Sequence, residues 1–269
     1  MNDSMTDQYI EFREPKTCRE LEAMLRLRYT VRRSCKLAAL CPENEAGIDI
    51  DQFDRYAYHV GLFTPSADGF IPVGCSRVVT GKPGPQHKWV SEFACKNRLE
   101  QKLQVPEQVF PSLSYLPAEH GNKVIDLCNA VLEDGETIGE SCGACLHPDI
   151  KSIRIARLWV DSIVAYFKVW NDIRYVVMTI SPHHMSFYSR NGFSPFPGLP
   201  NSSLADFGAP FTFCLLGHLP ESETTVARLQ MLASDLNSTG KIVISEGVPQ
   251  PVSINQTNIP KRMSQCLPA

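Results

Sequence analysis

The stretch from residue 123 to residue 193 constrains the fold most, because strand and helix patterns alternate along it with short breaks. An apolar run predicts a strand over 124–132, and apolar residues at helical spacing predict a helix over 152–170. A β-branched run predicts a second strand over 173–180, and a helix that opens on a proline follows over 182–191. We therefore expect a right-handed strand-helix-strand unit within an α/β fold.

Length and composition suit a globular protein. The chain has 269 residues, of which 43% are apolar, and we expect one large domain over 1–245 with a flexible tail over 246–269, where Pro, Asn, Gln and Ser are frequent. No apolar run is long enough to cross a bilayer, and the first 16 residues are too polar for a signal peptide, so we expect a cytoplasmic protein with no stable membrane span. The net charge of −3 argues against a nucleic-acid partner.

Ten cysteines are scattered along the chain without a compact framework, which favours reduced and mostly buried thiols in a cytosolic protein. Cys142 and Cys145 form a C-x-x-C pair, but no second pair stands at zinc-like spacing. A redox role is the alternative, although the pair lies within an expected loop rather than at the start of a helix. We therefore expect no metal site.

The N-terminal half combines a helix with a strand hairpin. Thr17 is a suitable N-cap for a helix with an apolar stripe and with Arg28 in its second half. Alternating patterns predict hairpin strands over 56–63 and 71–80. The remaining expected elements are a short strand over 9–13, a helix over 91–104, a strand over 211–216, a helix over 221–236 and a β-branched run over 241–245.

Three segments resemble known acyltransferases. Phe187-Tyr188, followed by Gly192-Phe193, resembles the FY-x-x-x-GF pattern of the GNAT acyltransferase superfamily. Residues 51–54 read D-x-F-D and residues 73–77 read V-G-x-x-R, which resembles the N-terminal half of the acyl-homoserine-lactone (autoinducer) synthases and of the N-acyl amino acid synthases. The run that starts at Asp126 resembles their fourth strand. Both families move a fatty acyl group from acyl carrier protein to the amine of an amino acid.

The resemblance implies a GNAT-like α/β fold, in which a mixed, mostly antiparallel twisted sheet is flanked by helices and its fourth and fifth strands splay apart. It implies that the acyl carrier arm lies along the fourth strand, and that its phosphate lies at the start of the following helix, where free amides and the helix dipole favour anions. No cofactor is then bound permanently. The co-substrate is an acyl-phosphopantetheine thioester, on acyl carrier protein or on coenzyme A, and the partners are acyl carrier protein and a small-molecule amine acceptor.

The same resemblance assigns two catalytic residues, Asp126 as the base and Tyr188 as the donor to the leaving thiol. An amine attacks a thioester only when it is neutral, which requires a proton acceptor, and a lone acid inside an apolar strand is costly unless it is paired or employed. Glu140, in the loop after that strand, is a weaker substitute. The residues assigned to the acceptor pocket are Arg28, Asp51, Asp54, Arg77, Cys128 and Asn129. Those assigned to the carrier arm and phosphate are Val131, Leu132, Lys151, Ser152, Arg154, Ala156 and His184.

Each assignment has a structural alternative. Asp126 can pair with a nearby arginine, Tyr188 can simply pack in the core, and the acids at 51 and 54 can pin the hairpin through Arg77. Two positions also depart from the families: Asn129 stands where the synthases have an arginine, and Arg154 replaces the first glycine of the GNAT phosphate loop.

Three functions therefore compete. The preferred one is an N-acyltransferase that uses acyl carrier protein and acts on the amine of an amino acid or of a homoserine-lactone-like acceptor. The second is a GNAT enzyme that uses acetyl-CoA or another short acyl-CoA on a small amine, and the third is an inactive GNAT-fold protein that binds a lipid or a carrier. Lys151, Arg154 and Arg157 suit the single phosphodiester and the acidic helix of acyl carrier protein better than a pyrophosphate. The sequence leaves the acceptor, the acyl length and the oligomeric state open.

Overall fold

The structure is a computed structural model, and it describes residues 9–35, 38, 41–114, 116–196, 198–199, 202–204, 209–216 and 222–245. The segments 202–204 and 209–216 are described by their backbone. The predicted tail over 246–269 lies outside the described residues.

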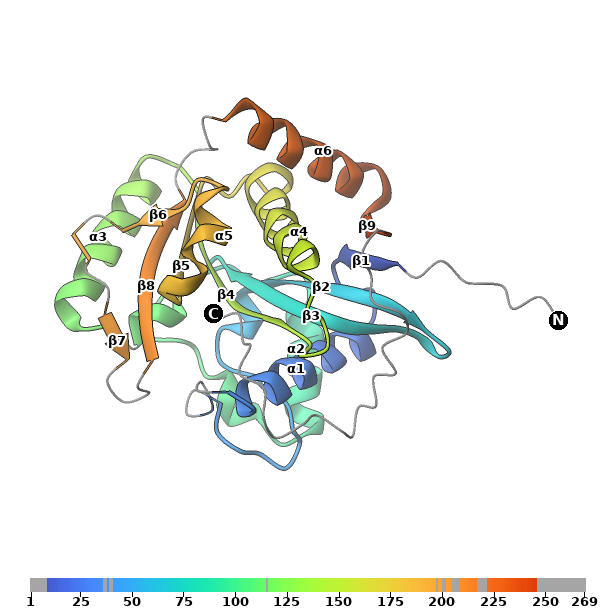
Figure 1. The fold of residues 1–269 in the computed structure, drawn as a ribbon. Helices are drawn as coiled ribbons and strands as arrows, with labels where there is room; N and C mark the ends of the chain where they lie inside the picture. Colours follow the sequence, from blue (N-terminus) through green and yellow to red (C-terminus); the bar gives the residue numbers. More distant parts are fainter. Residues whose placement is uncertain are drawn as a thin grey trace.

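One twisted, mixed sheet forms the centre of the molecule (Figure 1). Its strands run in the spatial order β6-β8-β5-β4-β3-β2-β1-β9, and β7 pairs with β8. Among the described strands, every pair is antiparallel except β4 with β5. The strands are β1 (Ile10–Arg13), β2 (Ala57–Ser66), β3 (Gly69–Val79), β4 (Ile138–Leu146), β5 (Tyr175–Ile180), β6 (Ser194–Pro195), β7 (Ser202–Leu204), β8 (Ala209–Leu216) and β9 (Ile242–Ile244).

Helices cover both faces of the sheet (Figure 1). One face carries α4 (Ile153–Val164), its continuation as a wider helical turn, η5 (Ala165–Trp170), and α6 (Glu223–Thr239). The other face carries α1 (Cys18–Arg33), α2 (His87–Lys96) and α3 (Ala118–Glu133). The remaining helical segments are α5 (Met185–Ser189) and the short turns η2 (Asp54–Tyr56), η3 (Glu100–Leu103), η4 (Pro111–Ser114) and η6 (Pro182–His184).

A large apolar core lies between α4, α6 and the sheet. Trp159 and Ile155 of α4 are fully buried there, and the rings of Trp159 and Phe12 meet edge to face with their centres 5.6 Å apart. Leu229 and Leu236 of α6 complete the same core. The apolar side chains lie on one stripe of each helix, and α6 packs against α4, η5 and the edge strand β9.

The single parallel pair of the described sheet is short, and its strands then separate. β4 and β5 pair over three positions, and the last pair is Glu140 with Val177, although β4 continues for six more residues. Beyond that point Cys142 lies opposite Arg77 and Cys145 lies opposite Cys75. Three steps along β4 therefore match two steps along β3, so β4 contains one extra residue. Gly143 lies within this bulge with a φ of +67°, a conformation that favours glycine. Because β4 runs on for six residues without pairing with β5, the expected splay of the fourth and fifth strands is confirmed.

The strand predicted over 124–132 is wrong, because these residues belong to α3. Its buried residues Val124, Cys128 and Val131 recur at helical spacing, and the positions between them are exposed or half-buried. The fourth strand lies instead in the expected loop, at Ile138–Leu146. Glycine, serine, alanine and cysteine make up most of that strand, and these residues give a weak strand signal although every position is buried.

The other predicted elements of the unit are confirmed: α4 with η5 matches the helix over 152–170, β5 the strand over 173–180, and η6 with α5 the helix over 182–191. The mixed, mostly antiparallel α/β architecture expected from the GNAT resemblance is confirmed as well. Among the described helices, none combines the length and the apolar character needed to cross a membrane.

Candidate active site

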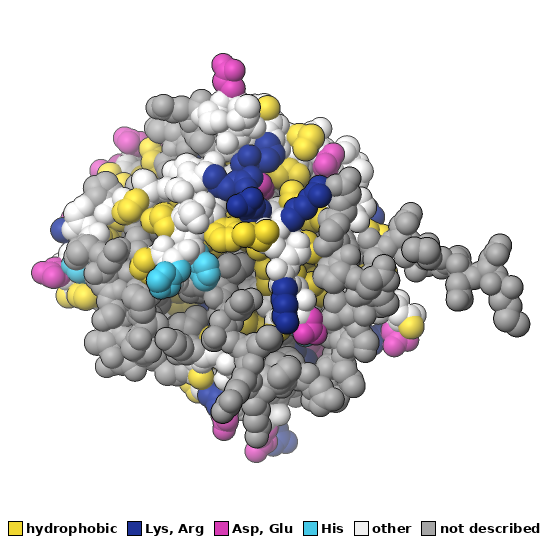
Figure 2. All heavy atoms as spheres, in the orientation of Figure 1, with side chains coloured by type: hydrophobic (Ala, Val, Ile, Leu, Met, Phe, Trp, Pro, Cys, Tyr) yellow, Lys and Arg dark blue, Asp and Glu magenta, His cyan; other side chains and the backbone are white. Residues whose placement is uncertain are grey.

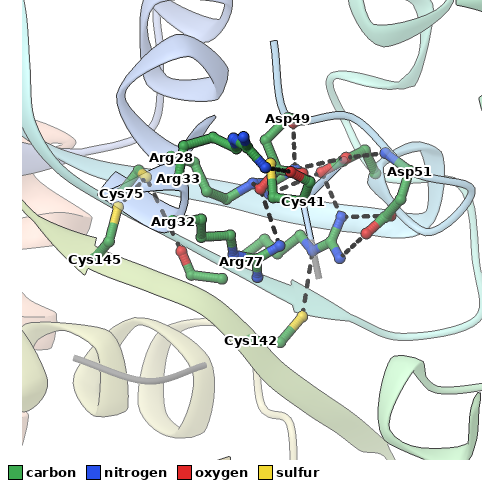
Figure 3. A network of polar contacts seen from close by, with 12 residues as sticks. Arg28, Arg32, Arg33, Cys41, Asp49, Asp51, Cys75, Arg77, Cys142 and Cys145 are labelled. Atoms are coloured by element: carbon green, nitrogen blue, oxygen red, sulfur yellow. Dashed lines mark hydrogen bonds and ion pairs between the residues drawn. The ribbon is translucent and has the colours of Figure 1, made fainter. Parts of the chain in front are cut away.

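A network of buried charged side chains lies between α1 and the centre of the sheet (Figure 3). It joins α1, the turn before β2, and the strand β3. Each arginine in it contacts at least one carboxylate, so charge is balanced locally. Its charged members are Arg28, Arg32, Arg77, Asp49, Asp51 and Asp54.

Asp54 is the centre of this network. Its Oδ2 accepts hydrogen bonds from Arg28 Nη2 at 2.8 Å and from the backbone N–H of Asp51 at 2.9 Å. Its Oδ1 lies 2.6 Å from Nη1 of Arg77. Burial alone would raise the pKa of Asp54, but the guanidinium groups of Arg28 and Arg77 outweigh burial and hold that pKa below its usual range. Asp54 is therefore a permanent buried anion.

Arg77 connects the turn before β2 with strand β4. Its Nη1 and Nη2 contact the two carboxylate oxygens of Asp51 at 2.7 and 2.6 Å, and its Nε donates to the Cys142 thiol at 3.2 Å. The Arg77 side chain is 2% exposed, whereas that of Asp51 is 35% exposed. Asp51 is thus the solvent-facing end of the pair, and the fork geometry of the guanidinium orients it.

His59 on β2 contacts the backbone of the network at Asp54. Its Nε2 lies 3.0 Å from the backbone oxygen of Asp54. Burial, with a smaller contribution from Arg28 and Arg77, lowers the pKa of His59 to about 4 against the opposing effect of Asp54. The imidazole is therefore neutral at physiological pH, and it satisfies a buried carbonyl without adding charge.

A second buried carboxylate, Glu140, lies on the same face of the sheet, at the last position where β4 pairs with β5. The neighbour that holds it is Ser112 of η4, whose hydroxyl donates to Oε2 at 2.7 Å and whose backbone N–H lies 3.0 Å from Oε2 and 3.2 Å from Oε1. Glu140 and Ser112 are both fully buried. Glu140 therefore stands at the point where β4 and β5 begin to diverge.

Burial raises the pKa of Glu140 to about 7, against the hydrogen bonds from Ser112 and the attraction of Arg77, which both lower it; Asp51 raises it. A carboxyl group with such a pKa exchanges its proton near neutral pH, which is the property of a general base. Burial likewise raises the pKa of the neighbouring Cys142 thiol to about 11, so that thiol stays protonated.

The structure brings together four of the predicted acceptor residues, Arg28, Asp51, Asp54 and Arg77, in one network. It separates the other two from them. Asn129 lies on the exposed side of α3, and Cys128, on the buried side, contacts the apolar cluster beneath β4.

The placement of Asp126 inside an apolar strand is wrong, because Asp126 is exposed on α3. The reason for choosing it as the base therefore no longer holds. Val131 and Leu132 also lie on α3, so they cannot lend a strand backbone to a carrier arm. The acid on the true fourth strand is Glu140.

The start of α4 has the expected form. Ser152 caps it and accepts from the N–H of Ile155 at 3.4 Å, and Lys151 and Arg154 are exposed beside it, with Ala156 half-buried. Figure 2 shows Lys and Arg side chains gathered over α4 on this face. The loop between β4 and α4 spans 147–152, so the helix N-terminus directly follows the splayed strand.

The two predicted residues beyond β5 lie on the α4 side of the sheet. Tyr188 of α5 is buried in the core shared with α4, and its ring meets that of Phe193 edge to face at 5.7 Å. His184 of η6 is half-buried, and burial lowers its pKa. Both follow the end of β5, next to the splay.

Sequence reasoning missed part of this site. Ser112 stands in a proline-punctuated segment that gives no motif, and Asp49 and His59 fall outside the D-x-F-D pattern. Asp49 is nevertheless bound by Arg28 at 3.0 Å and by Arg32 at 2.9 Å. None of these three residues lies in a recognisable motif. Of the buried acids, Glu140 is marked in the sequence only as an isolated acid in a run of small residues.

The C-x-x-C pair is not one unit. The thiol of Cys145 lies 3.2 Å from that of Cys75 on β3, whereas Cys142 points to Arg77. Within the described part of the chain, no group of three or more His, Cys, Asp or Glu side chains is arranged to hold a metal ion. Five of the eight described cysteines are buried, and all eight are free thiols.

Comparison with known proteins gives structural neighbours only. No protein-family model and no curated protein sequence matches the chain. The fold is similar to that of FeeM, an N-acyl amino acid synthase from uncultured soil microbes, with 15% identity, a TM-score of 0.47, and coverage of 81% of this chain and 94% of that one. It is similar to BjaI, a CoA-dependent acyl-homoserine lactone synthase, with 14% identity, a TM-score of 0.44, and coverage of 80% and 82%. LasI, an AHL synthase, aligns with 16% identity, a TM-score of 0.43, and coverage of 80% and 98%.

Proposed function

We propose that the protein is an N-acyltransferase, in which Glu140 takes the proton of an amine that attacks a phosphopantetheine thioester. The observation that supports this most is the position of Glu140: a buried carboxylate with a pKa near 7, at the residue where the two parallel strands stop pairing. A splay between parallel strands exposes backbone groups to which an extended carrier arm can bond. The acid and the carrier arm then meet at one point.

The proposed reaction needs one proton acceptor and one proton donor. The amine nitrogen attacks the thioester carbonyl, the C–N bond forms, and the C–S bond breaks to release a thiolate. Glu140 takes the proton that leaves the nitrogen, directly or through a water, and Tyr188 donates a proton or a hydrogen bond to the thiolate. At pH values above 7 most Glu140 groups are ionised and competent as bases.

For the acceptor we propose an amino acid or its lactone, which binds with its amine neutral and donates an N–H hydrogen bond to Asp51. Asp51 is the half-exposed end of the network, whereas the arginine beside it is buried and already engaged with two carboxylates and a thiol. In this assignment Arg77 holds Asp51 and does not itself bind the acceptor. The fixed pair holds Asp51 in one orientation, which gives the acceptor a defined position.

For the donor we propose acyl carrier protein rather than coenzyme A. The exposed basic residues at the start of α4 are Lys151, Arg154 and Arg157, and they surround a helix N-terminus that favours one phosphate. Ile153, 59% exposed, lies among them and adds an apolar contact. A basic surface with an apolar centre complements an acidic helix of a carrier.

The test compares two acids, Glu140→Gln and Asp126→Asn, in a thiol-release assay with acyl-carrier-protein and acyl-CoA donors and a panel of amino acids. Loss of a general base costs typically 100-fold to 10,000-fold in rate, so we expect Glu140→Gln to fall by about that factor and Asp126→Asn to retain activity. Glu133→Gln, an exposed acid at the end of α3, serves as the neutral control. Mass spectrometry of lipid extracts from expressing cells identifies the N-acyl product.

The alternatives give different results in the same assay. Turnover of acetyl-CoA with no turnover of acyl carrier protein would indicate the short-chain GNAT enzyme. Carrier binding without product from any donor would indicate a binding protein. Equal activity of Glu140→Gln and the wild type would refute Glu140 as the base.

A further inference from the structure

We propose that Ser112 is the positioning residue for Glu140, so that the base of the proposed reaction is complete only when the segment between β3 and β4 is seated on the sheet. This inference rests on the proposed function and deepens it. Ser112 precedes Glu140 by 28 residues in the chain and lies in no recognisable motif.

The contact is specific in its geometry. In the part of the chain that the structure describes, both hydrogen-bond donors to Glu140 belong to Ser112: the hydroxyl to Oε2 at 2.7 Å, and the backbone N–H to Oε2 at 3.0 Å and, more weakly, to Oε1 at 3.2 Å. Oε2 is therefore the anchored oxygen. Oε1 is the less engaged oxygen, and we assign to it the proton taken from the amine.

The neighbours of the carboxylate explain why a neutral donor matters here. The charged and titratable groups around Glu140 are Arg77 and Asp51 on the network side, and the thiols of Cys128 on α3 and Cys142 on β4. Arg77 is committed to Asp51 and to a second acid, and both thiols stay protonated because burial raises their pKa values. Ser112 is left as the partner that fixes the orientation of the acid without cancelling its charge.

The segment that carries Ser112 is held by apolar packing. Phe110, fully buried, contacts the cluster formed by α3 and the strand ends, which includes Val124 and Val131. The turn is closed by a hydrogen bond from the N–H of Leu116 to the Ser112 carbonyl at 3.0 Å. Seating of the aromatic ring and placement of the serine are therefore one event, and loosening the ring should weaken the hydrogen bonds to Glu140.

A positioning role has a signature that packing alone lacks. Removing the hydroxyl in Ser112→Ala leaves the N–H in place but takes away the shorter of the bonds to Oε2, which favoured the ionised acid. The proton should then be held more tightly. A hydrogen bond to a charged group is worth enough to change the proton affinity at least about tenfold, or about one pH unit.

The experiment is a ¹³C NMR titration of the full chain labelled at the glutamate side-chain carboxyl carbon, with Glu140→Gln to assign the signal. We expect the midpoint of Glu140 to rise by about one pH unit in Ser112→Ala, to stay near the wild-type value in Ser112→Thr, which keeps a hydroxyl, and to be unchanged in Ser114→Ala, an exposed serine of the same turn. In the thiol-release assay, the acid limb of kcat/KM should move to higher pH by the same amount in Ser112→Ala.

The outcomes separate this inference from the proposed function. An unchanged midpoint in Ser112→Ala overturns the positioning role whatever the activity. A shifted midpoint in a chain without acyltransfer activity would refute the proposed function and, with it, the catalytic purpose of the contact. If Ser112→Ala does not fold, Phe110→Leu provides the second test, because it leaves the serine intact and should raise the midpoint in the same direction; no change in that variant overturns the coupling to the segment.

Discussion

Two buried carboxylates on one face of the same sheet behave in opposite ways. Asp54 and Glu140 are both completely excluded from solvent. Asp54 lies between two guanidinium groups, which hold its pKa below the usual range, whereas Glu140 has a serine as its close partner and burial raises its pKa to about 7. Because the two side chains are equally buried, their different hydrogen-bonding and ion-pair partners account for their different charge states.

This difference gives the two carboxylates different roles: Asp54 is structural, whereas Glu140 can take part in proton transfer. A carboxylate between arginines keeps its charge at every physiological pH, and its removal leaves cations without a counterion, so it can shape a pocket but cannot carry a proton. A carboxylate with neutral partners can exchange a proton near pH 7. Arg77 links the two regions, because it contacts Asp54 directly and also lowers the pKa of Glu140 from a distance.

The largest effect is expected from Asp54→Asn. The substitution leaves the guanidinium groups of Arg28 and Arg77 buried without their shared anion, and breaking a buried pair in this way costs about 3–5 kcal/mol. Urea unfolding at pH 7, monitored by circular dichroism, measures the loss. A loss below about 1 kcal/mol would mean that Asp54 is not the centre of the network.

Glu140→Gln should change stability in the opposite sense, and in a pH-dependent way. The folded protein holds a proton on Glu140 up to about pH 7, whereas the unfolded chain releases it near pH 4.5, so wild-type stability falls as pH rises between these values. The penalty is absent below pH 4.5 and complete above pH 7, where it amounts to roughly 3 kcal/mol at about 1.4 kcal/mol per pKa unit.

The amide variant carries no such penalty. We therefore expect Glu140→Gln to be more stable than the wild type at pH 8 and close to it at pH 5, as measured by urea unfolding at the two pH values. The neutral control is Glu133→Gln, which should track the wild type at both. Equal differences for Glu140→Gln at pH 5 and pH 8 would show that its pKa is not raised, and the comparison with Asp54 would fail.

The two acids also differ in how far the sequence predicted them. Asp54 was found because it stands in a short motif, D-x-F-D, next to a clear strand hairpin, and local pattern is enough to place it. The sequence pattern favours Asp126 over Glu140 because the strand that it predicts over 124–132 begins about 14 residues before β4. The apolar run at 124–132 resembled a strand in composition, and only its spacing of buried residues revealed a helix.

The error has a physical origin. Strand β4 is fully buried by helices, β3 and β5, so small residues suffice there and β-branched residues are not required. A Cβ at Gly139 would lie 2.7 Å from a methyl group of Val78, which shows that close packing of neighbouring strands selects small residues. Contacts made by distant parts of the chain, such as Ser112 with Glu140, leave no local pattern to read.

An intermediate effect is expected from Arg77→Lys. Lysine keeps the positive charge but cannot contact Asp51 through two nitrogens while it also contacts Asp54 and the Cys142 thiol. We expect a loss of about 1–3 kcal/mol in the free energy of unfolding, smaller than that of Asp54→Asn. In the thiol-release assay, the KM for the acceptor should rise more than kcat falls, because Asp51 loses its fixed orientation. A fall in kcat alone would place Arg77 in the chemical step instead.

The smallest effect, and the finest test of the comparison, is expected from Asp51→Asn. The Asp51 side chain is 35% exposed and Arg77 retains Asp54, so the loss of stability should be about 1 kcal/mol or less. Asp51 raises the pKa of Glu140 through its negative charge, so neutralising it should lower the midpoint of Glu140 in the ¹³C titration. Ser112→Ala is expected to move the same midpoint upward. Opposite shifts from the two variants would show that Glu140 responds separately to the charged network and to its neutral anchor, whereas shifts in one direction would mean that both act through a common change in burial.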